Sequence, residues 1–227
     1  MDKELKMQLL KEFRAEGIDF CKKAYDFITE EEVTHSDFTP PTEVKAVDLG
    51  LPSGNLWADR NVGAESEEDD GLWFSWGNIG GCDIKSYHEF SEKSYNESEG
   101  ARIKSDINAP EHDAARMYMG GNWRMPTKED FEELDEYCEH EWVDETYRKG
   151  MKFISKKNGK SIFFPASGGR SGTSLDDRGS HGYYWSSSLG SSAYGYDMHF
   201  NSGGVNPANY DDRFYGFSVR AVQHLSS

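Results

Sequence analysis

The sequence is poor in cysteine, and its few cysteines follow no pattern. Among 227 residues there are only three, Cys21, Cys82 and Cys138. An odd number of widely spaced thiols matches neither the disulfide framework of a small secreted domain nor the paired spacing of a zinc site. We therefore expect reduced, buried or half-buried thiols, and no metal.

Positive charge is also in short supply. The chain has 25 Lys and Arg against 41 Asp and Glu, a net charge of -16. Phosphate backbones and anionic membranes attract basic surfaces, so we expect neither nucleic acid nor a membrane as a partner. No segment approaches the roughly 20 apolar residues of a membrane span. The start, MDKELKMQLLKEF, lacks the basic and then apolar pattern of a signal peptide.

Recognisable catalytic motifs are missing as well. The sequence has no Gly-x-Ser-x-Gly elbow, no phosphate-binding loop and no dinucleotide fingerprint. Cys138 and His140 stand two apart on a predicted helix and would point to different faces. The other histidines are scattered, and carboxylate pairs such as Asp176-Asp177 are common in so acidic a chain. We expect no catalytic residue and no cofactor.

The chain divides by composition into three parts. Residues 3–32 carry an apolar stripe at helical spacing, which predicts an N-terminal helical appendage over 1–33. This helix either packs on its own domain or docks to a partner. Prolines in THSDFTPPTE indicate a linker at 34–44, and a domain of short strands and turns follows at 45–227.

Within this domain the clearest local patterns are one helix and one hairpin. Pro126, Thr127 and Asp130 predict a capped helix start, with Phe131, Leu134 and Cys138 as its buried stripe. MKFISKKNGKSIFFPAS predicts two strands joined by a type I′ turn at Asn158-Gly159. Residues 65–71 and 83–110 are expected to be surface loops, and LWFSWGN, GYYWSSS, AYGYDMHF and FSVRAVQHL are expected to be strands.

The C-terminal segment mixes aromatic and acidic residues. Alternation in AYGYDMHF places an apolar set on one face, expected to be core, and leaves Asp197 and His199 outward on the other face beside Gly195. The apolar set is Tyr194, Tyr196, Met198 and Phe200. The following stretch, NSGGVNPANYDDRFYG, is rich in Tyr, Asp, Gly and Ser, a composition typical of evolved binding loops. It predicts either a ligand-binding surface or a loop that only covers the core.

Five stretches, in order, resemble one family: VDLGLPSGNLWADRNVGA, HDAARMYMGGNWRMPTKEDFEEL, KSIFFPASGGRSGT, GYYWSSS and GFSVRAV. They are similar to the C-type-lectin-like domains, related to formylglycine-generating enzymes, of the major paralogous proteins of gut Bacteroidetes and their phages. The resemblance covers about Lys45 to Val222. It implies an α+β, C-type-lectin-like fold, with short helices around a twisted antiparallel sheet.

Some members of that family resemble the variable proteins of diversity-generating retroelements, in which adenines of asparagine codons are rewritten near the 3′ end of the gene. Such AAC codons can become Tyr, Asp, His, Ser, Gly, Phe or Leu codons. Leu189, Ser191 and Ser192 also belong to the residue types that such codons can encode, but they lie before the main stretch of proposed variable positions. The resemblance implies a diversified ligand-binding surface at ten positions: Gly195, Asp197, His199, Ser202, Gly204, Tyr210, Asp211, Asp212, Phe214 and Tyr215.

The expected function is non-catalytic recognition of a protein or glycan on a cell or particle, such as a phage receptor. Tyr210, Phe214 and Tyr215 would be aromatic anchors, and Trp185, Phe200, Val219 and Val222 an invariant buried scaffold. A phage tail or the bacterial cytoplasm is the expected location. The alternatives are a divergent enzyme of the formylglycine-generating superfamily, whose catalytic cysteines have no counterpart here, and a structural domain of a larger assembly.

Overall fold

Most of the regular structure in this chain is β-structure. A computed structural model describes residues 43–85 and 88–224. Of these residues, 41% lie in strands or bridges and 15% in helices. The predicted α+β class, with helices around one twisted sheet, is therefore wrong. The predicted helical appendage (1–33) lies outside the described residues, as does the linker (34–44) apart from its last two residues.

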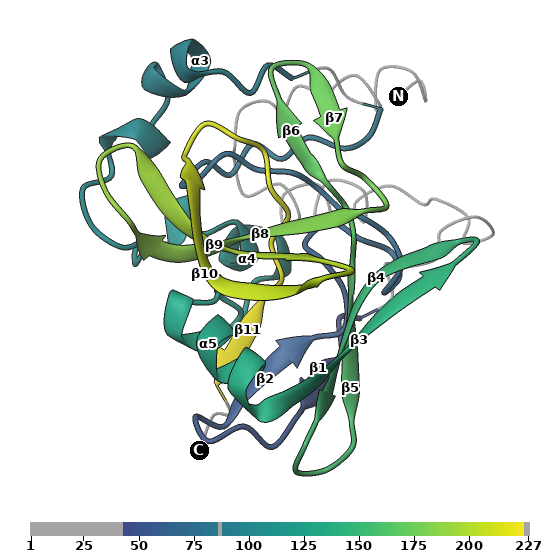
Figure 1. Cartoon of the computed structure of the whole chain (residues 1–227). Coiled ribbons are helices and arrows are strands. Elements are labelled where there is room, and N and C mark those ends of the chain that lie inside the picture. Colours follow the sequence, from purple (N-terminus) through teal and green to yellow (C-terminus); the bar gives the residue numbers. More distant parts are fainter. Residues whose placement is uncertain (1–42, 86–87, 225–227) are drawn as a thin grey trace, which may run out of the picture. The chain divides into compact units, whose positions relative to one another are not determined.

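The strands form four small antiparallel sheets (Figure 1). Their order is β1-β2-β11, β10-β9-β8, β3-β4-β5 and β6-β7. The strands are β1 (Ala46–Asp48), β2 (Asn55–Ala58), β3 (Cys138–Glu145), β4 (Arg148–Ser155), β5 (Ser161–Pro165), β6 (Gly169–Ser171), β7 (Ser174–Asp176), β8 (His181–Leu189), β9 (Tyr194–Asn201), β10 (Gly204–Asp212) and β11 (Val222–His224).

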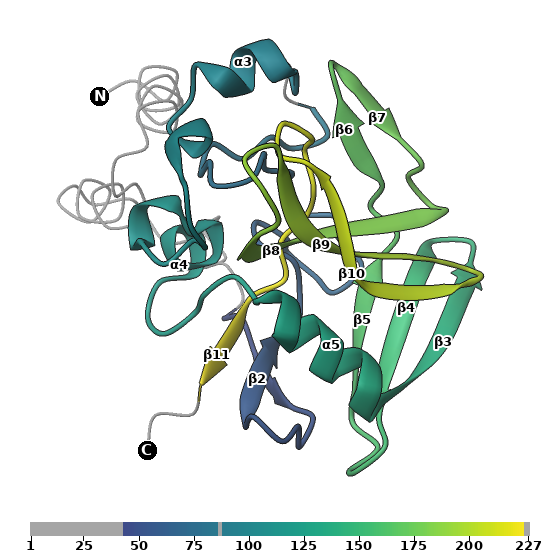
Figure 2. The same cartoon turned by 60° about the vertical axis from the view of Figure 1, so that its left-hand side comes forward.

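The helices are short. They are α3 (Glu92–Asn96), α4 (Ala114–Met119) and α5 (Lys128–Tyr137), with single 3₁₀ turns η1 (Gly100–Arg102) and η2 (Pro110–His112). Figure 2 shows α5 beside the β8-β9-β10 sheet. None of the helices in residues 43–85 and 88–224 combines the length and the apolar character that crossing a bilayer requires.

The β8-β9-β10 sheet lies between two hydrophobic clusters. Tyr184, Met198 and Phe200 pack with Phe131 and Leu134 of α5 in one cluster. In the other cluster the sheet contributes Trp185, which packs with Trp76, Phe217 and Val219. The predicted buried scaffold is confirmed: all of its members are fully buried, namely Trp185, Phe200, Val219 and Val222.

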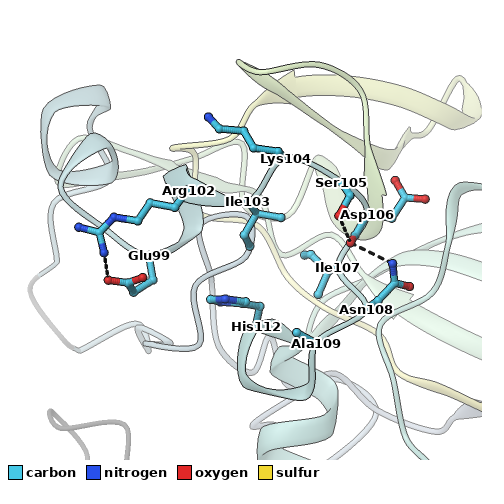
Figure 3. Close-up of a pocket in the computed structure, with 10 residues that line it drawn as sticks. All are labelled: Glu99, Arg102, Ile103, Lys104, Ser105, Asp106, Ile107, Asn108, Ala109 and His112. Atoms are coloured by element: carbon cyan, nitrogen blue, oxygen red, sulfur yellow. Dashed lines mark hydrogen bonds and ion pairs between the residues drawn. The ribbon is translucent and has the colours of Figure 1, made fainter.

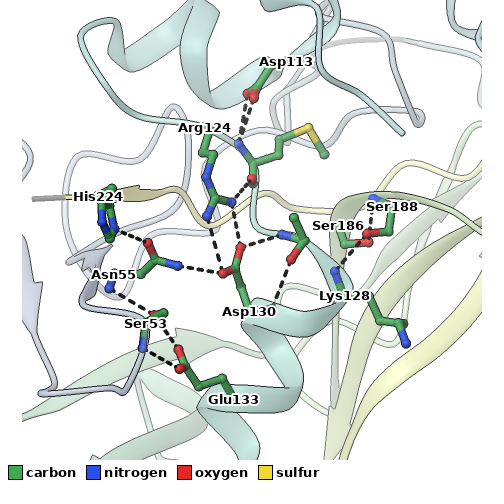
Figure 4. A network of polar contacts seen from close by, with 12 residues as sticks. Ser53, Asn55, Asp113, Arg124, Lys128, Asp130, Glu133, Ser186, Ser188 and His224 are labelled. Atoms are coloured by element: carbon green, nitrogen blue, oxygen red, sulfur yellow. Dashed lines mark hydrogen bonds and ion pairs between the residues drawn. The ribbon is translucent and has the colours of Figure 1, made fainter. Parts of the chain in front are cut away.

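The N-terminus of α5 is fixed by a polar network (Figure 4). Thr127 Oγ1 accepts a hydrogen bond from the Asp130 N–H, and the Asp130 carboxylate accepts one from the Thr127 N–H, which confirms the predicted cap. Asp130 also accepts from Asn55 Nδ2 at 2.7 Å and from Arg124 at 2.6 Å. The Lys128 N–H donates to Ser188 Oγ. The helix is thereby joined to β2 and to β8.

The predicted hairpin of β4 and β5 is present, but its turn is not type I′. A type I′ turn needs positive φ at both central residues. Only Gly159 has it, at φ +72°, and Asn158 does not. Instead Ser155 Oγ accepts from the N–H groups of Lys157 and Asn158, and these bonds shape a longer loop.

Three other expectations need correction. FSVRAVQHL, expected to be a strand, forms isolated bridges at Phe217 and Ser218 and then the short strand β11. LWFSWGN forms isolated bridges at Trp73 and Phe74 instead of a strand. The segment 83–110, expected to be a surface loop, contains α3 and η1 and buries the side chains of Phe90, Tyr95 and Ile107. These segments have little regular structure, yet their aromatic side chains and one Ile, irregularly spaced in the sequence, fill part of the core.

Arg220 lies at the centre of the domain and is fully buried. Its guanidinium donates to Asn61 Oδ1 (2.9 Å), Ala58 O (3.1 Å) and Phe163 O (2.8 Å), and it sits 4.5 Å from the centre of the Phe164 ring. Burial lowers the pKa of Arg220 to about 10, so it is still charged at neutral pH.

We expect Arg220→Met to destabilise the protein by about 3 kcal/mol or more, because it leaves three buried acceptors without their donor. Urea denaturation followed by Trp fluorescence measures the free energy of unfolding. Arg102→Met is the matched control, since the Arg102 side chain is 69% exposed and its ion pair among the described residues is with Glu99. It should change stability by less than about 0.5 kcal/mol. Equal effects of the two substitutions would contradict a central role for Arg220.

Candidate functional site

The β8-β9-β10 sheet has two faces with different surroundings. Tyr183 pairs with His199 and Trp185 with Asp197, so these four side chains share one face, which we call the stack face. On β10, Asn209 pairs with Asp197, and Asp211 pairs with Gly195 on the same face. The opposite face, the helix face, packs against α5.

The stack face carries a row of nearly parallel rings. His199 lies 4.8 Å from Tyr183 and 5.3 Å from His181, at interplanar angles of 23° and 12°. Phe217 continues the row, 4.9 Å from Tyr183 and 5.9 Å from Tyr215. Phe217 is buried, and the other four rings are partly exposed. We call His181, Tyr183, His199, Phe217 and Tyr215 the aromatic stack.

Carboxylates border the aromatic stack. Tyr183 Oη donates to Asp177 Oδ2 at 3.4 Å. Asp177 has φ +59°, the only positive φ among the described residues other than glycine, and its carbonyl oxygen accepts from the Ser180 and His181 N–H groups. A tight turn thus places this carboxylate beside the ring. Burial, aided by Asp177 and Asp211, raises the pKa of Tyr183 to about 12.

Asp197 is a fully buried acid next to the stack. Asn209 Nδ2 donates to both of its oxygens, at 3.2 and 3.3 Å, and also to Asp211 Oδ2 at 3.0 Å. A bulge between Asn206 and Asn209 brings this amide opposite Asp197. Burial, together with the nearby Asp211, raises the pKa of Asp197 well above its ordinary value. Two carboxylates therefore share one neutral donor.

The ten predicted binding residues do not form one surface. His199, Asp211 and Tyr215 lie at the aromatic stack, whereas Tyr210 pairs with Tyr196 and Asp212 with Tyr194 on the other face. Ser202 and Gly204 are at the exposed β9–β10 turn, and Phe214 contacts Tyr215 at 4.5 Å. The stretch expected to be a loop is largely strand β10.

Two of the ten predicted binding residues are interior. Asp197 was expected to face outward and is fully buried. Gly195 is buried as well, and a Cβ at this position would lie 2.6 Å from Cδ1 of Trp76, itself fully buried. Close packing therefore requires glycine at 195. Both positions belong to the scaffold of the site.

Five residues of the site were not predicted to belong to it: Asp177, His181, Tyr183, Asn209 and Phe217. A signal existed in the alternation of HGYYW, which puts His181 and Tyr183 on one face of a strand. The sequence does not show that His199 would pair with them across the sheet. Burial and His181 lower the pKa of His199, whose buried Nε2 has no hydrogen-bonding partner among the described groups.

A separate pocket of about 310 Å³ lies between Glu99 and His112 (Figure 3). Arg102 pairs with Glu99 on one wall, and Ile103 and Ile107 add apolar surface. Asp106 on the other wall accepts a hydrogen bond from the Leu189 N–H. The pocket thus adjoins the β8–β9 turn, where Leu189, Ser191 and Ser192 were predicted less surely to vary, and it contains no stacked rings.

Within the described part of the chain, no three His, Cys, Asp or Glu side chains come together as ligands of a metal ion would. Cys82 and Cys138 are buried and form no disulfide bond among the described residues, as expected, and burial raises the pKa of the Cys138 thiol to about 11. Cys21 lies outside the described residues.

Comparison with known proteins gives one match. Residues 132–222 match the model of a domain of unknown function, DUF8237. No curated protein and no solved structure matches the chain. The matched segment contains β8, β9 and β10, and with them most of the aromatic stack.

We expect Gly195→Ala to destabilise the protein by about 1–3 kcal/mol, because the new methyl group overlaps the Trp76 ring. Gly80→Ala is the matched control, since a Cβ at Gly80 meets nothing within 4 Å. Urea denaturation of both variants measures the difference. A stable Gly195→Ala variant would mean that position 195 is free to vary after all.

We also expect Asp197→Asn to change how stability depends on pH. The raised pKa means that the folded state binds a proton more tightly than the unfolded state, so the wild type loses stability as pH rises above about 3.8. Asn cannot ionise, so the variant should gain stability relative to wild type between pH 4 and pH 8. Asp144→Asn, at an exposed acid paired with Lys149, should show no such trend.

Proposed function

We propose that this protein is a non-catalytic binding protein that recognises a ligand on the surface of a cell or particle through the stack face of its β8-β9-β10 sheet. The observation that carries this proposal is the row of partly exposed, nearly parallel rings bordered by carboxylates. Rigid rings provide contact area at a low cost in conformational entropy, and the carboxylates provide directional polar contacts.

The sheet under these rings is well suited to hold a fixed geometry. Trp185 Nε1 donates to Phe74 O at 2.8 Å, and Trp76 Nε1 donates to Ser186 O at 2.9 Å. Both rings are fully buried beneath the stack face. A surface held by such contacts loses little freedom when a ligand binds, which favours affinity.

The same arrangement supports diversification by a retroelement as a further part of the proposal. Eight of the ten predicted variable positions have at least partly exposed backbone or side chain. Arg213, within the same stretch, is buried and donates to Gly100 O and Ser192 O, as a scaffold residue would. Recognition of this kind suits a phage tail component that meets a host cell.

The genetic test is to sequence the DNA downstream of the gene. We expect a near-copy of the segment that encodes Leu189 to Val222, differing where the copy has adenine, next to a reverse-transcriptase gene. The differing codons should include those of His199, Asp211 and Tyr215 and should spare Gly195. Absence of the copy would overturn the diversification and leave the binding function to the next experiment.

The binding test uses the labelled full chain against immobilised glycans and against fixed bacterial cells. We expect Tyr215→Ala to weaken any specific binding at least tenfold, the effect of losing an aromatic anchor of about 2 kcal/mol. Tyr147→Ala is the control, because Tyr147 is 95% exposed on the distant β3–β4 turn. Binding that survives Tyr215→Ala, or that both substitutions weaken equally, would contradict a site on the stack face.

A further inference from the structure

Four carboxylates near the aromatic stack, three on the stack face and Asp212 on the helix face near Tyr215, have no cationic partner among the described residues. Asp177, Asp197, Asp211 and Asp212 form no ion pair with any described Lys, Arg or His. The nearby Arg178 pairs with Asp70 instead, at 2.5 Å. These acids lie close enough to influence the ring hydroxyls, since Asp177, Asp211 and Asp197 act on Tyr183, and Asp212 and Asp211 act on Tyr215.

The lack of a cationic partner is energetically most unfavourable for Asp197, because this side chain is fully buried. A carboxylate with no exposed surface is stable in its charged form only beside a compensating charge or several donors. Its one described donor is the amide of Asn209, which it shares with Asp211. The described groups therefore do not stabilise the charged form of Asp197, in agreement with its raised pKa, and the carboxylates open to a cationic ligand are the exposed Asp177 and the partly exposed Asp211.

The rings of the stack are also free of cations, in contrast to other rings of this protein. Elsewhere the chain places its own cations on aromatic faces, at 4.2 to 5.4 Å from the ring centres. No described Lys or Arg lies over a ring of the aromatic stack. The cationic groups so placed are Lys128 over Tyr196, Arg148 over Phe163, Arg170 over Trp73, Arg213 over Trp76 and Tyr95, and Arg220 over Phe164.

We infer that the stack face takes a guanidinium group, supplied by an arginine on the surface of a protein partner. A planar guanidinium fits against parallel rings and can donate two hydrogen bonds to a carboxylate at the edge, either Asp177 or Asp211. The inference rests on the proposed function and narrows its ligand from protein or glycan to a basic protein surface.

The test compares two small probes on the full chain. N-acetyl-arginine amide carries the guanidinium, and N-acetyl-citrulline amide is its neutral isostere. Ligand-detected NMR titration should give a dissociation constant in the millimolar range for the arginine probe and at least tenfold weaker binding for citrulline. Asp211→Asn should weaken arginine binding at least fivefold, whereas Asp144→Asn should leave it unchanged.

A second variant guards against a folding defect at Asp211. Asn tolerates the left-handed backbone of residue 177, so Asp177→Asn should fold normally and should also weaken arginine binding. Equal binding of the two probes, no binding of either up to about 50 mM, or no effect of both Asp→Asn substitutions would overturn the guanidinium site. If a glycan binds in a way that depends on Tyr215 but not on Asp211 or Asp177, the proposed function stands and this inference fails.

Discussion

The buried guanidinium of Arg220 is the constraint on which the domain depends. It joins the end of β2, the Asn61 loop and β5 through three hydrogen bonds. The Asn61 amide nitrogen in turn donates to the hydroxyl of Tyr184 in β8 and to the carbonyl oxygen of Asp70. A charge in an interior of low polarity is tolerated only where its donors are satisfied. The acceptors must therefore stay in place, and they come from segments far apart in the chain. Three small sheets, those that contain β2, β5 and β8, are held in one arrangement by this requirement.

The aromatic stack depends on that arrangement because it is assembled across strands. His181 and Tyr183 come from β8, His199 from β9, and Phe217 and Tyr215 from the segment that leads to Arg220. Beneath them Trp185 and Trp76 are fixed by hydrogen bonds to backbone carbonyl oxygens. Side chains at the outer positions can change without disturbing these contacts. Gly195 and Asp197 cannot, since one is in contact with Trp76 and the other is enclosed between β8 and β10.

Local patterns in the sequence predict those parts of the fold that local contacts decide. The cap of α5 depends on Thr127 and Asp130, three residues apart, and the β4–β5 hairpin on adjacent strands. The overall class was wrong because helical patterns are few and short, and irregular segments such as 72–78 supply core side chains without any periodic signal. Strand β10 was not predicted because its Asn, Pro and Asp residues have low strand propensity. It is a strand because it pairs with β9, and the sequence of β10 alone does not show that pairing.

The site was predictable in composition but not in geometry, and strand alternation explains why. Alternation correctly assigns each residue to one face of a sheet. It predicts whether that face is exposed to solvent only when the sheet packs against the core with one face and leaves the other in water. The β8-β9-β10 sheet is buried on both faces over much of its length, so Asp197 lies on the predicted face and yet inside the protein. An acid in such a place must hold a proton or meet a cation. The raised pKa of Asp197 corresponds to the first of these, because the described cations of the chain lie on other rings and other carboxylates.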